Sequence, residues 1–193
     1  TQPTEVQLRA IPPAMVGSDL RVSSSTGSGK TAAFVLPALS RVLAARGDAS
    51  KRRDNKTVHG PRVLVLTPTR ELAMQVAKAT DSYGRHIPGL RVATIVGGVP
   101  YHAQLKALRG PLDVLIATPG RLMDHMANGK AVLANVELFV LDEADRMLDM
   151  GFIDDIKHIA SFLPEQRQTV MFSATFAGEV GQLAKSMLKT DAQ

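Results

Sequence analysis

The 193-residue sequence contains no cysteine and no tryptophan, and it has only two tyrosines. Without cysteine the chain can form neither disulfides nor thiolate metal sites, which fits a reducing compartment, and we expect a cytoplasmic protein. Few large aromatic side chains are available to stack on bases. A bound nucleic acid would therefore be held mainly through its backbone.

Long apolar runs are also absent. The unbroken runs, such as VLVL and LFVL, are far shorter than the roughly 20 residues that cross a bilayer, and no basic segment followed by an apolar one opens the sequence. We therefore expect no membrane-spanning helix and no secretion signal. The net charge of +5 favours a polyanionic partner, although a merely basic surface is the alternative.

Short apolar segments alternate with longer segments of helical period. This alternation predicts an α/β fold with a mostly parallel sheet and helices on both faces. Each predicted strand ends in a polar or glycine-rich cluster, and in such folds ligands bind at the carboxyl ends of the strands. The predicted strands are 19–23, 62–66, 91–96, 113–117, 138–142 and 169–173.

The charged segment at 46–56, RGDASKRRDNK, has no periodicity. It predicts an exposed loop, extending to about residue 60, that joins a helix to the strand at 62–66. Its three consecutive basic residues, 51–53, leave a contact with nucleic acid as the alternative to a solvated loop.

The stretch SSSTGSGKT at 23–31 follows a predicted strand and precedes a helix-like segment. Small residues let successive backbone N–H groups approach phosphate oxygens at the helix N-terminus. Lys30 would reach the β- and γ-phosphates of a nucleotide, and the Thr31 hydroxyl would bind Mg²⁺. The rest of this predicted phosphate loop consists of Ser25, Thr26, Gly27, Ser28 and Gly29.

The match to the usual phosphate-loop pattern is incomplete, because Ser24 stands where a glycine is usual. A flexible serine-glycine turn is the alternative. That alternative leaves the preceding strand and the following helix unexplained.

The segment FVLDEAD supplies an acidic pair directly after a buried strand. Asp142 would hold Mg²⁺ through water, and Glu143 would orient and deprotonate an attacking water. Adjacent acids on an ordinary helix surface would mean little. After a hydrophobic strand, in a chain that also contains GSGKT, they form a specific pair.

These motifs, in their order, resemble the first RecA-like domain of a DEAD-box ATP-dependent RNA helicase. The resemblance covers nearly all of the chain and rests on PTEVQ, STGSGKT, PTRELA, GG, TPGR, DEAD and SAT. DEADRMLDMGF and MFSATF are most similar to the bacterial RhlE-type branch. The resemblance implies a RecA-like domain over 1–193, with the second RecA-like domain absent from this chain.

The resemblance also assigns roles to single residues. Gln7 would read the adenine edge, with Thr4 bracing the same element. Ser173 and Thr175 would couple the nucleotide state to RNA binding, partly by contact with Asp145. Without the resemblance, Gln7 would be an ordinary surface residue and SAT a strand end with small side chains.

RNA contacts are implied at three further motifs. Backbone amides in loops shaped by glycine and proline would meet phosphates, and two arginines would add charge-assisted hydrogen bonds. Arg70 could instead pair with its neighbour Glu71. The implied RNA-binding residues are Pro68, Thr69, Arg70, Gly97, Gly98, Thr118, Pro119, Gly120 and Arg121.

Two features depart from the family pattern. Arg21 stands where the first strand, expected to be central, usually carries an apolar residue, so its guanidinium needs a carboxylate or must extend to the sheet edge. The chain also begins inside the adenine-recognition element, and the family's upstream aromatic residue is missing. We expect this to weaken nucleotide affinity by roughly 1–2 kcal/mol.

The resemblance implies an ATP hydrolase that uses ATP and Mg²⁺ and binds RNA without sequence preference. It also implies a second RecA-like lobe of the same protein as a partner, and we expect the isolated domain to be monomeric and poorly active. Two alternatives remain at this point. One is a related superfamily-2 translocase acting on DNA or RNA, which Gln7 and Asp145 disfavour. The other is a non-catalytic ATP-dependent RNA-binding module, which Glu143 disfavours.

Overall fold

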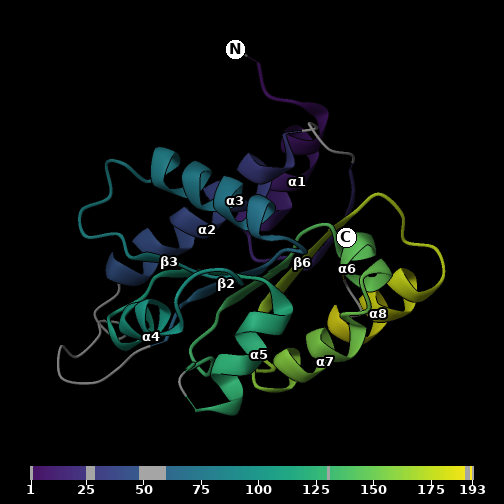
Figure 1. The fold of residues 1–193 in the computed structure, drawn as a ribbon. Helices are drawn as coiled ribbons and strands as arrows, with labels where there is room; N and C mark the ends of the chain where they lie inside the picture. The colour runs from purple at the N-terminus through teal and green to yellow at the C-terminus, as the bar shows by residue number, and fades with distance from the viewer. Residues whose placement is uncertain (1, 25–28, 48–59, 130, 190–191, 193) are drawn as a thin grey trace.

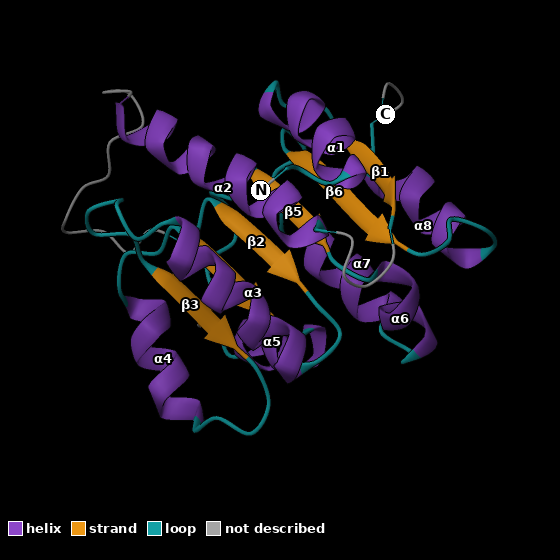
Figure 2. Ribbon diagram, turned by 90° about the horizontal axis from the view of Figure 1, so that it is seen from above, coloured by secondary structure: helices purple, strands orange, loops and turns teal. Residues whose placement is uncertain are grey.

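The structure, a computed structural model, describes residues 2–24, 29–47, 60–129, 131–189 and 192. Six strands form one sheet in the order β1-β6-β5-β2-β4-β3, and every neighbouring pair is parallel. The arrows in Figure 2 accordingly point the same way. The strands are β1 (Leu20–Ser23), β2 (Val63–Leu66), β3 (Val92–Ile95), β4 (Val114–Ala117), β5 (Leu138–Leu141) and β6 (Gln168–Ser173).

Helices cover both faces of this sheet (Figure 1). α1 (Glu5–Met15), α2 (Lys30–Gly47) and α3 (Arg70–Tyr83) lie on one face. The other face carries α4 (Tyr101–Arg109), α5 (Pro119–Ala127), α6 (Ala144–Asp149), α7 (Ile153–Ser161) and α8 (Glu179–Met187). The predicted α/β fold with a parallel sheet and helices on both faces is confirmed, and each predicted strand is present to within a residue of its expected bounds.

The sheet has a separate apolar core on each face because alternate strand residues point in opposite directions. In β2, Val63 and Val65 pack with α1, α2 and α3, whereas Leu64 and Leu66 pack with α4 to α8. All four of these side chains are at most 2% exposed. The run of four apolar residues is therefore explained by burial on both faces, as expected for a central parallel strand.

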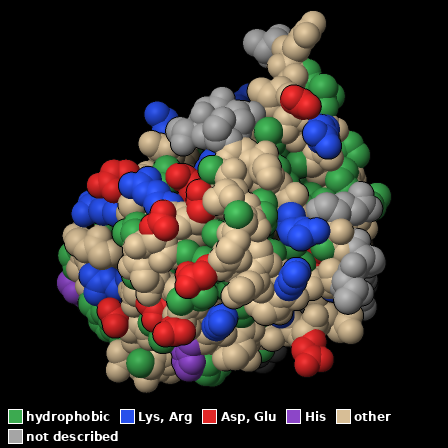
Figure 3. Space-filling model, turned by 90° about the vertical axis from the view of Figure 1, so that its right-hand side faces the viewer, with side chains coloured by type: hydrophobic (Ala, Val, Ile, Leu, Met, Phe, Trp, Pro, Cys, Tyr) green, Lys and Arg blue, Asp and Glu red, His purple; other side chains and the backbone are tan. Residues whose placement is uncertain are grey.

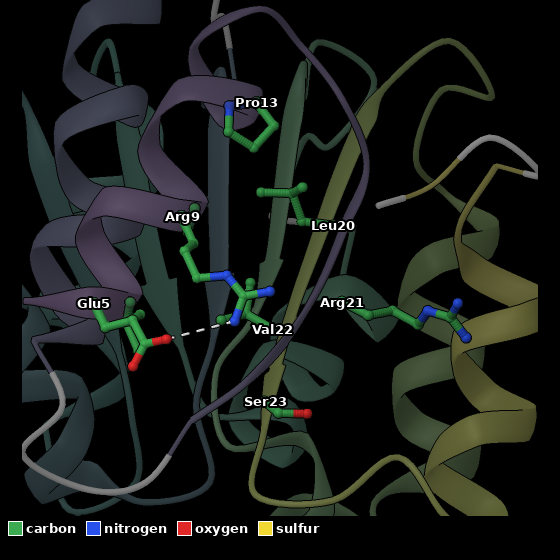
Figure 4. A pocket seen from close by; sticks show the side chains of 9 residues that line it. Glu5, Arg9, Pro13, Leu20, Arg21, Val22 and Ser23 are labelled. Carbon is green, nitrogen blue, oxygen red and sulfur yellow. Dashed lines mark ion pairs between the residues drawn. The ribbon is translucent and has the colours of Figure 1, made fainter.

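The prediction that the first strand is central is wrong. β1 pairs only with β6 and forms an edge of the sheet among the described residues. At an edge Arg21 can leave the sheet, and the residue is exposed. Figure 4 shows its side chain extending away from α1, although Arg21 is among the residues that line the hollow between α1 and β1. Of the two outcomes expected for Arg21, the sheet edge is the one found.

No helix within the described parts of the chain combines the length and apolarity needed to span a membrane. On the face turned to the viewer in Figure 3, acidic and basic side chains are interspersed. The positive net charge is thus not gathered into one patch on this face. The predicted loop at 46–60 lies largely in residues 48–59, which are outside the described residues; its first two residues, Arg46 and Gly47, end α2.

Candidate functional site

The predicted polar clusters gather along one edge of the sheet, because they follow the carboxyl ends of parallel strands. β1 leads toward the phosphate loop, β5 ends at Leu141 directly before Asp142, and β6 ends at Ser173. These three strands are neighbours in the sheet. β2, β4 and β3, which precede the other three clusters, form the other half of the sheet.

Lys30 faces both residues of the acidic pair. Its Nζ lies 3.0 Å from Asp142 Oδ1 and 3.3 Å from Glu143 Oε2. The three side chains are 10%, 2% and 17% exposed, respectively. At such burial an ion pair is stronger than at the surface, since little water screens it. The first residue of α2 is thereby joined to the end of β5.

The two carboxylate oxygens that face Lys30 are short of partners. Asp142 Oδ1 and Glu143 Oε2 are buried, and neither has a hydrogen bond of normal geometry among the described residues. Burial raises the pKa of Asp142, and the nearby Lys30 ammonium acts in the opposite direction. Buried oxygen atoms of this kind are suitable ligands for a hard cation such as Mg²⁺.

Within the described residues no group of three or more His, Asp or Glu side chains could hold a metal ion. This does not conflict with a magnesium site at Asp142, because Mg²⁺ usually keeps several waters and takes one or two carboxylates plus substrate phosphates. The residues present therefore fit the ion.

Glu143 has a left-handed backbone, with φ of 53° and ψ of 54°. Among the described residues it is the only non-glycine with positive φ. Such a conformation costs of order 1–3 kcal/mol and is found mostly where function requires it. The strained residue turns the chain from β5 directly into α6 and leaves its carboxylate beside Lys30.

Gly29, Gln7 and Thr4 join the N-terminus of α1 to the phosphate loop. Gln7 Nε2 donates to the Gly29 carbonyl at 3.2 Å. Thr4 and Gln7 form a capping box, in which Gln7 Oε1 accepts from the Thr4 N–H at 3.0 Å and Thr4 Oγ1 accepts from the Gln7 N–H at 3.3 Å. Gly29 has φ of +82°, and an added Cβ would lie 2.7 Å from Gln7 Nε2 and from Thr4 Oγ1. Only glycine fits there.

Ser173 lies beside the entry to the phosphate loop, because its carbonyl accepts from the Ser24 N–H at 3.0 Å. Its Oγ donates to the Thr175 carbonyl at 2.6 Å, and Thr175 Oγ1 accepts from the Ala177 N–H at 3.1 Å. The hydrogen bonds of these two side chains are thus local. None joins them to Asp145 among the described residues, and the expected coupling through Asp145 stays a prediction.

The structure describes only the end of the predicted phosphate loop. Ser25, Thr26, Gly27 and Ser28 lie outside the described residues. Gly29, Lys30 and Thr31 are described, and Lys30 and Thr31 open α2, whose first turn supplies the N–H groups expected to meet phosphate.

The other three predicted motifs meet in a surface hollow of about 420 Å³. It is formed by the segments that follow β2, β3 and β4, with one residue from the start of α7. The lining residues are Pro68, Arg70, Gly97, Thr118, Gly120, Arg121, Asp124 and Phe152. Thr69, Gly98 and Pro119 were predicted with them but do not line the hollow: Thr69 caps α3 and Pro119 is buried at the start of α5.

Gly98 lies against Arg70. A Cβ added to Gly98 would be 2.6 Å from an Arg70 guanidinium nitrogen, and Gly98 has φ of +80°. Arg70 forms no ion pair with Glu71 in the described structure, so the alternative of a local pair is not what is found. Arg121, the second predicted arginine, donates from Nε to the Val96 carbonyl at 3.3 Å and from Nη2 to the Val99 carbonyl at 3.2 Å.

Several residues at this site were missed by sequence reasoning. Asp124 and Phe152 line the hollow, and Tyr101, Gln104 and His125 lie beneath the adjoining segment. Asp124 stands one turn after Arg121 in α5, which is a periodicity that could have signalled it. Gln104 and His125 carry no local sequence signal.

The model of the DEAD/DEAH box helicase family matches residues 4–183. The chain is 42% identical over 188 residues to ATP-dependent RNA helicase DeaD of Buchnera aphidicola, covering 97% of this chain and 29% of the relative. It is 47% identical over 190 residues to the probable ATP-dependent RNA helicase ddx27 of Dictyostelium discoideum, covering 98% of this chain and 23% of the relative.

A solved structure, that of a hypothetical ATP-dependent RNA helicase from Sulfolobus tokodaii, matches the whole chain with a TM-score of 0.85 and 39% identity. The chain covers 52% of that structure and under a third of the two curated relatives, so it corresponds to one part of each. The RhlE-type branch stays a prediction. A family model that matches nearly every residue, relatives above 40% identity and a shared fold agree: the chain belongs to the DEAD/DEAH box helicase family.

Proposed function

We propose that this chain is the ATP-binding first RecA-like lobe of an RNA helicase that couples ATP hydrolysis to local separation of RNA strands. The observation that carries the proposal is the buried contact of Lys30 with Asp142 and Glu143 at the carboxyl edge of the sheet. The hollow lined by Arg70 and Arg121 opens at the same edge. A nucleotide site and a polyanion site on one edge are what such coupling requires.

In the proposed site, Gln7 hydrogen-bonds the adenine edge of ATP and the loop 25–29 surrounds the phosphates. The Gln7 amide uses one Nε2 hydrogen on Gly29 and one Oε1 lone pair on Thr4. Its second Nε2 hydrogen and second Oε1 lone pair are available to adenine. Lys30 exchanges its carboxylate partners for the β- and γ-phosphates. Glu143, thereby freed, accepts a proton from the attacking water.

Thr31 and Asp142 would hold Mg²⁺, Asp142 through water. When bound, the ion neutralises the charge that develops on the phosphate oxygens. The support within this chain is Asp142 Oδ1, which is buried beside the first turn of α2 without a hydrogen bond of normal geometry and lies 3.0 Å from Lys30 Nζ.

RNA is proposed to lie across the hollow, held by its phosphates. Arg70 and backbone groups of the segments 97–98 and 118–120 make these contacts, so binding is independent of sequence. Arg121 would contact a phosphate through Nη1, while its Nε and Nη2 donate to the carbonyls of Val96 and Val99. Ser173, Thr175 and Asp145 are proposed to transmit the nucleotide state to this surface after a rearrangement, since no hydrogen bond joins them in the described structure.

The second RecA-like lobe of the helicase is proposed to supply the arginine fingers, which are typically worth about 10³–10⁵ in rate. The isolated chain should therefore be a monomer that binds ATP and ADP weakly and hydrolyses ATP slowly. Phosphate release by the 193-residue chain, with and without single-stranded RNA, tests this. RNA-stimulated turnover near that of an intact helicase would contradict it.

RNA binding by the isolated chain should weaken as salt increases. If about three phosphates are neutralised, the slope of log affinity against log salt concentration is roughly −2 for a single strand. Fluorescence anisotropy of a labelled oligouridylate over a wide salt range measures it. An affinity that does not change with salt would contradict the phosphate contacts. Equal affinity for DNA of the same sequence would contradict the preference for RNA.

We expect Gly98→Ala to weaken RNA binding about tenfold, as the loss of one charge-assisted contact would. The added Cβ displaces the Arg70 guanidinium and strains the backbone at positive φ. Gly89→Ala is the matched control, because Gly89 also has positive φ (+67°), a Cβ there meets nothing within 4 Å, and the residue does not line the hollow. Its RNA affinity should stay within about twofold of wild type, a change no larger than surface substitutions usually make. Equal losses in the two variants would argue against a role for Arg70.

A further inference from the structure

A buried polar cluster lies between α4 and α5, beneath the segment 96–99. Gln104 is 2% exposed and His125 is 0% exposed. Gln104 Nε2 donates to the Val96 carbonyl at 2.7 Å, and Gln104 Oε1 lies 2.9 Å from His125 Nε2. One side chain thus joins the end of β3 to the helix that carries Arg121.

These partners fix the protonation of His125. The Val96 carbonyl only accepts, so the Gln104 amide must present its NH₂ there and its oxygen to His125. An amide oxygen also only accepts, so His125 Nε2 must carry a hydrogen. Nδ1 is buried and has no partner among the described residues, and it is left as a bare lone pair.

Other groups around His125 are consistent with a neutral ring. Burial lowers its pKa and the Arg121 guanidinium lowers it further, while Asp124 acts in the opposite direction. The ring stacks on Tyr101, with centroids 4.3 Å apart and planes 6° apart. Arg121 also lies over the Tyr101 ring, 5.9 Å from its centroid. His125 thereby serves as a packed, neutral donor to Gln104.

The carbonyl that Gln104 holds is shared with Arg121, whose Nε donates to the same Val96 oxygen. Arg121 also holds the Val99 carbonyl. The two glycines, 97 and 98, lie between these anchored carbonyls, and Gly98 contacts Arg70. The position of the glycine turn relative to both arginines therefore depends on the Val96 carbonyl.

We propose that Gln104, held by His125, is a positioning residue for RNA binding: it fixes the Val96 carbonyl and so sets the Gly97–Gly98 turn and Arg121 in their places beside Arg70. The inference rests on the proposed function, since it assigns the hollow lined by Arg70 and Arg121 to RNA. It requires no contact of Gln104 or His125 with RNA. Loss of the Gln104 amide should affect RNA binding and leave the nucleotide site unchanged.

The test is Gln104→Met, which keeps a similar volume and removes both hydrogen bonds. Labelled oligouridylate should bind the 193-residue variant about tenfold more weakly, the scale of one buried unsatisfied group. The affinity for a fluorescent ADP analogue should stay within about twofold, since the two lost hydrogen bonds involve only α4, α5 and the residue after β3, which carry none of the proposed nucleotide-binding residues. Gln182→Met, at an exposed position of α8, is the matched control and should change neither affinity.

A measurement on the wild-type chain keeps the inference testable if the variant does not fold. The ring ¹⁵N shifts of His125 should show a hydrogen on Nε2 and none on Nδ1 at neutral pH. RNA should shift the Gly97 and Gly98 amide signals while leaving this pattern unchanged. The opposite tautomer would overturn the inference.

The results separate the inference from the proposed function. If the wild-type chain does not bind oligouridylate, the proposed function fails first. If the wild type binds and Gln104→Met binds equally well, the inference alone fails. A parallel loss of RNA and ADP affinity would also overturn it, because that pattern indicates a general structural defect.

Discussion

Glu143→Gln should abolish most ATP hydrolysis while preserving ATP binding. We expect the turnover rate of the proposed two-lobed helicase to fall about 10²- to 10⁴-fold, the usual contribution of a general base, or about 3–5 kcal/mol of barrier. ATP affinity should stay within about twofold, since the substitution leaves the phosphate contacts of Lys30 in place. Single-turnover phosphate release and titration of a fluorescent ATP analogue measure the two quantities.

Glutamine is the appropriate substitute because it preserves the conformation of the site. Residue 143 has φ of 53°, and glutamine and glutamate are equally disfavoured there, so the backbone strain does not change. The amide keeps an oxygen of similar position but takes no proton from water. Glu165→Gln, at an exposed position, is the control for a change of charge alone.

Hydrolysis that survives in Glu143→Gln would assign the base elsewhere. Surviving hydrolysis would also keep the non-catalytic RNA-binding module excluded. That alternative would gain support only if the wild-type protein bound ATP without hydrolysing it, with Glu143 serving only to pair with Lys30.

The strands could be predicted because each is a short apolar run bounded by polar residues, as in VLVL of β2. The order of the strands could not, since it depends on pairings between residues far apart in the sequence. β1 pairs with β6, and Leu20 lies opposite Val170. The prediction of a central β1 failed at this step. Arg21, read there as a problem for the core, is an ordinary exposed residue of an edge strand.

The candidate site could be predicted where its chemistry is carried by consecutive residues. The motifs GSGKT and DEAD identify Lys30, Asp142 and Glu143 directly, and the parallel sheet brings these residues together. The left-handed conformation of Glu143 has no sequence signal, because glutamate rarely adopts it. Gln104 and His125 were missed for a similar reason: each is one polar residue in a helix, and only the packing of α4 on α5 buries them as a pair.

Lys30→Met should weaken the binding of ATP about 100-fold, or about 2.7 kcal/mol, because it removes the proposed charge-assisted contact to two phosphates. We also expect the nucleotide-free chain to lose about 3 kcal/mol of stability at neutral pH. Asp142 would be left buried without a cation, and Glu143 would keep only the more exposed Arg146, whose Nη1 lies 3.9 Å from Glu143 Oε1. Breaking a buried ion pair from one side costs about 3–5 kcal/mol. Nucleotide titration and urea unfolding measure the two effects.

The control for Lys30→Met is Lys78→Met, which removes the same charge from an exposed position of α3. It should alter neither nucleotide affinity nor unfolding.

A third variant separates the two roles of Lys30. Adding Asp142→Asn to Lys30→Met should restore part of the stability, since one uncompensated charge is removed, but none of the nucleotide affinity. Full stability in Lys30→Met alone would mean that the contact of Lys30 with the acidic pair contributes nothing to the fold. Lys30 would then act only on the nucleotide. Giving up its pairing with Asp142 and Glu143 would cost no free energy when Lys30 moves to the phosphates of ATP.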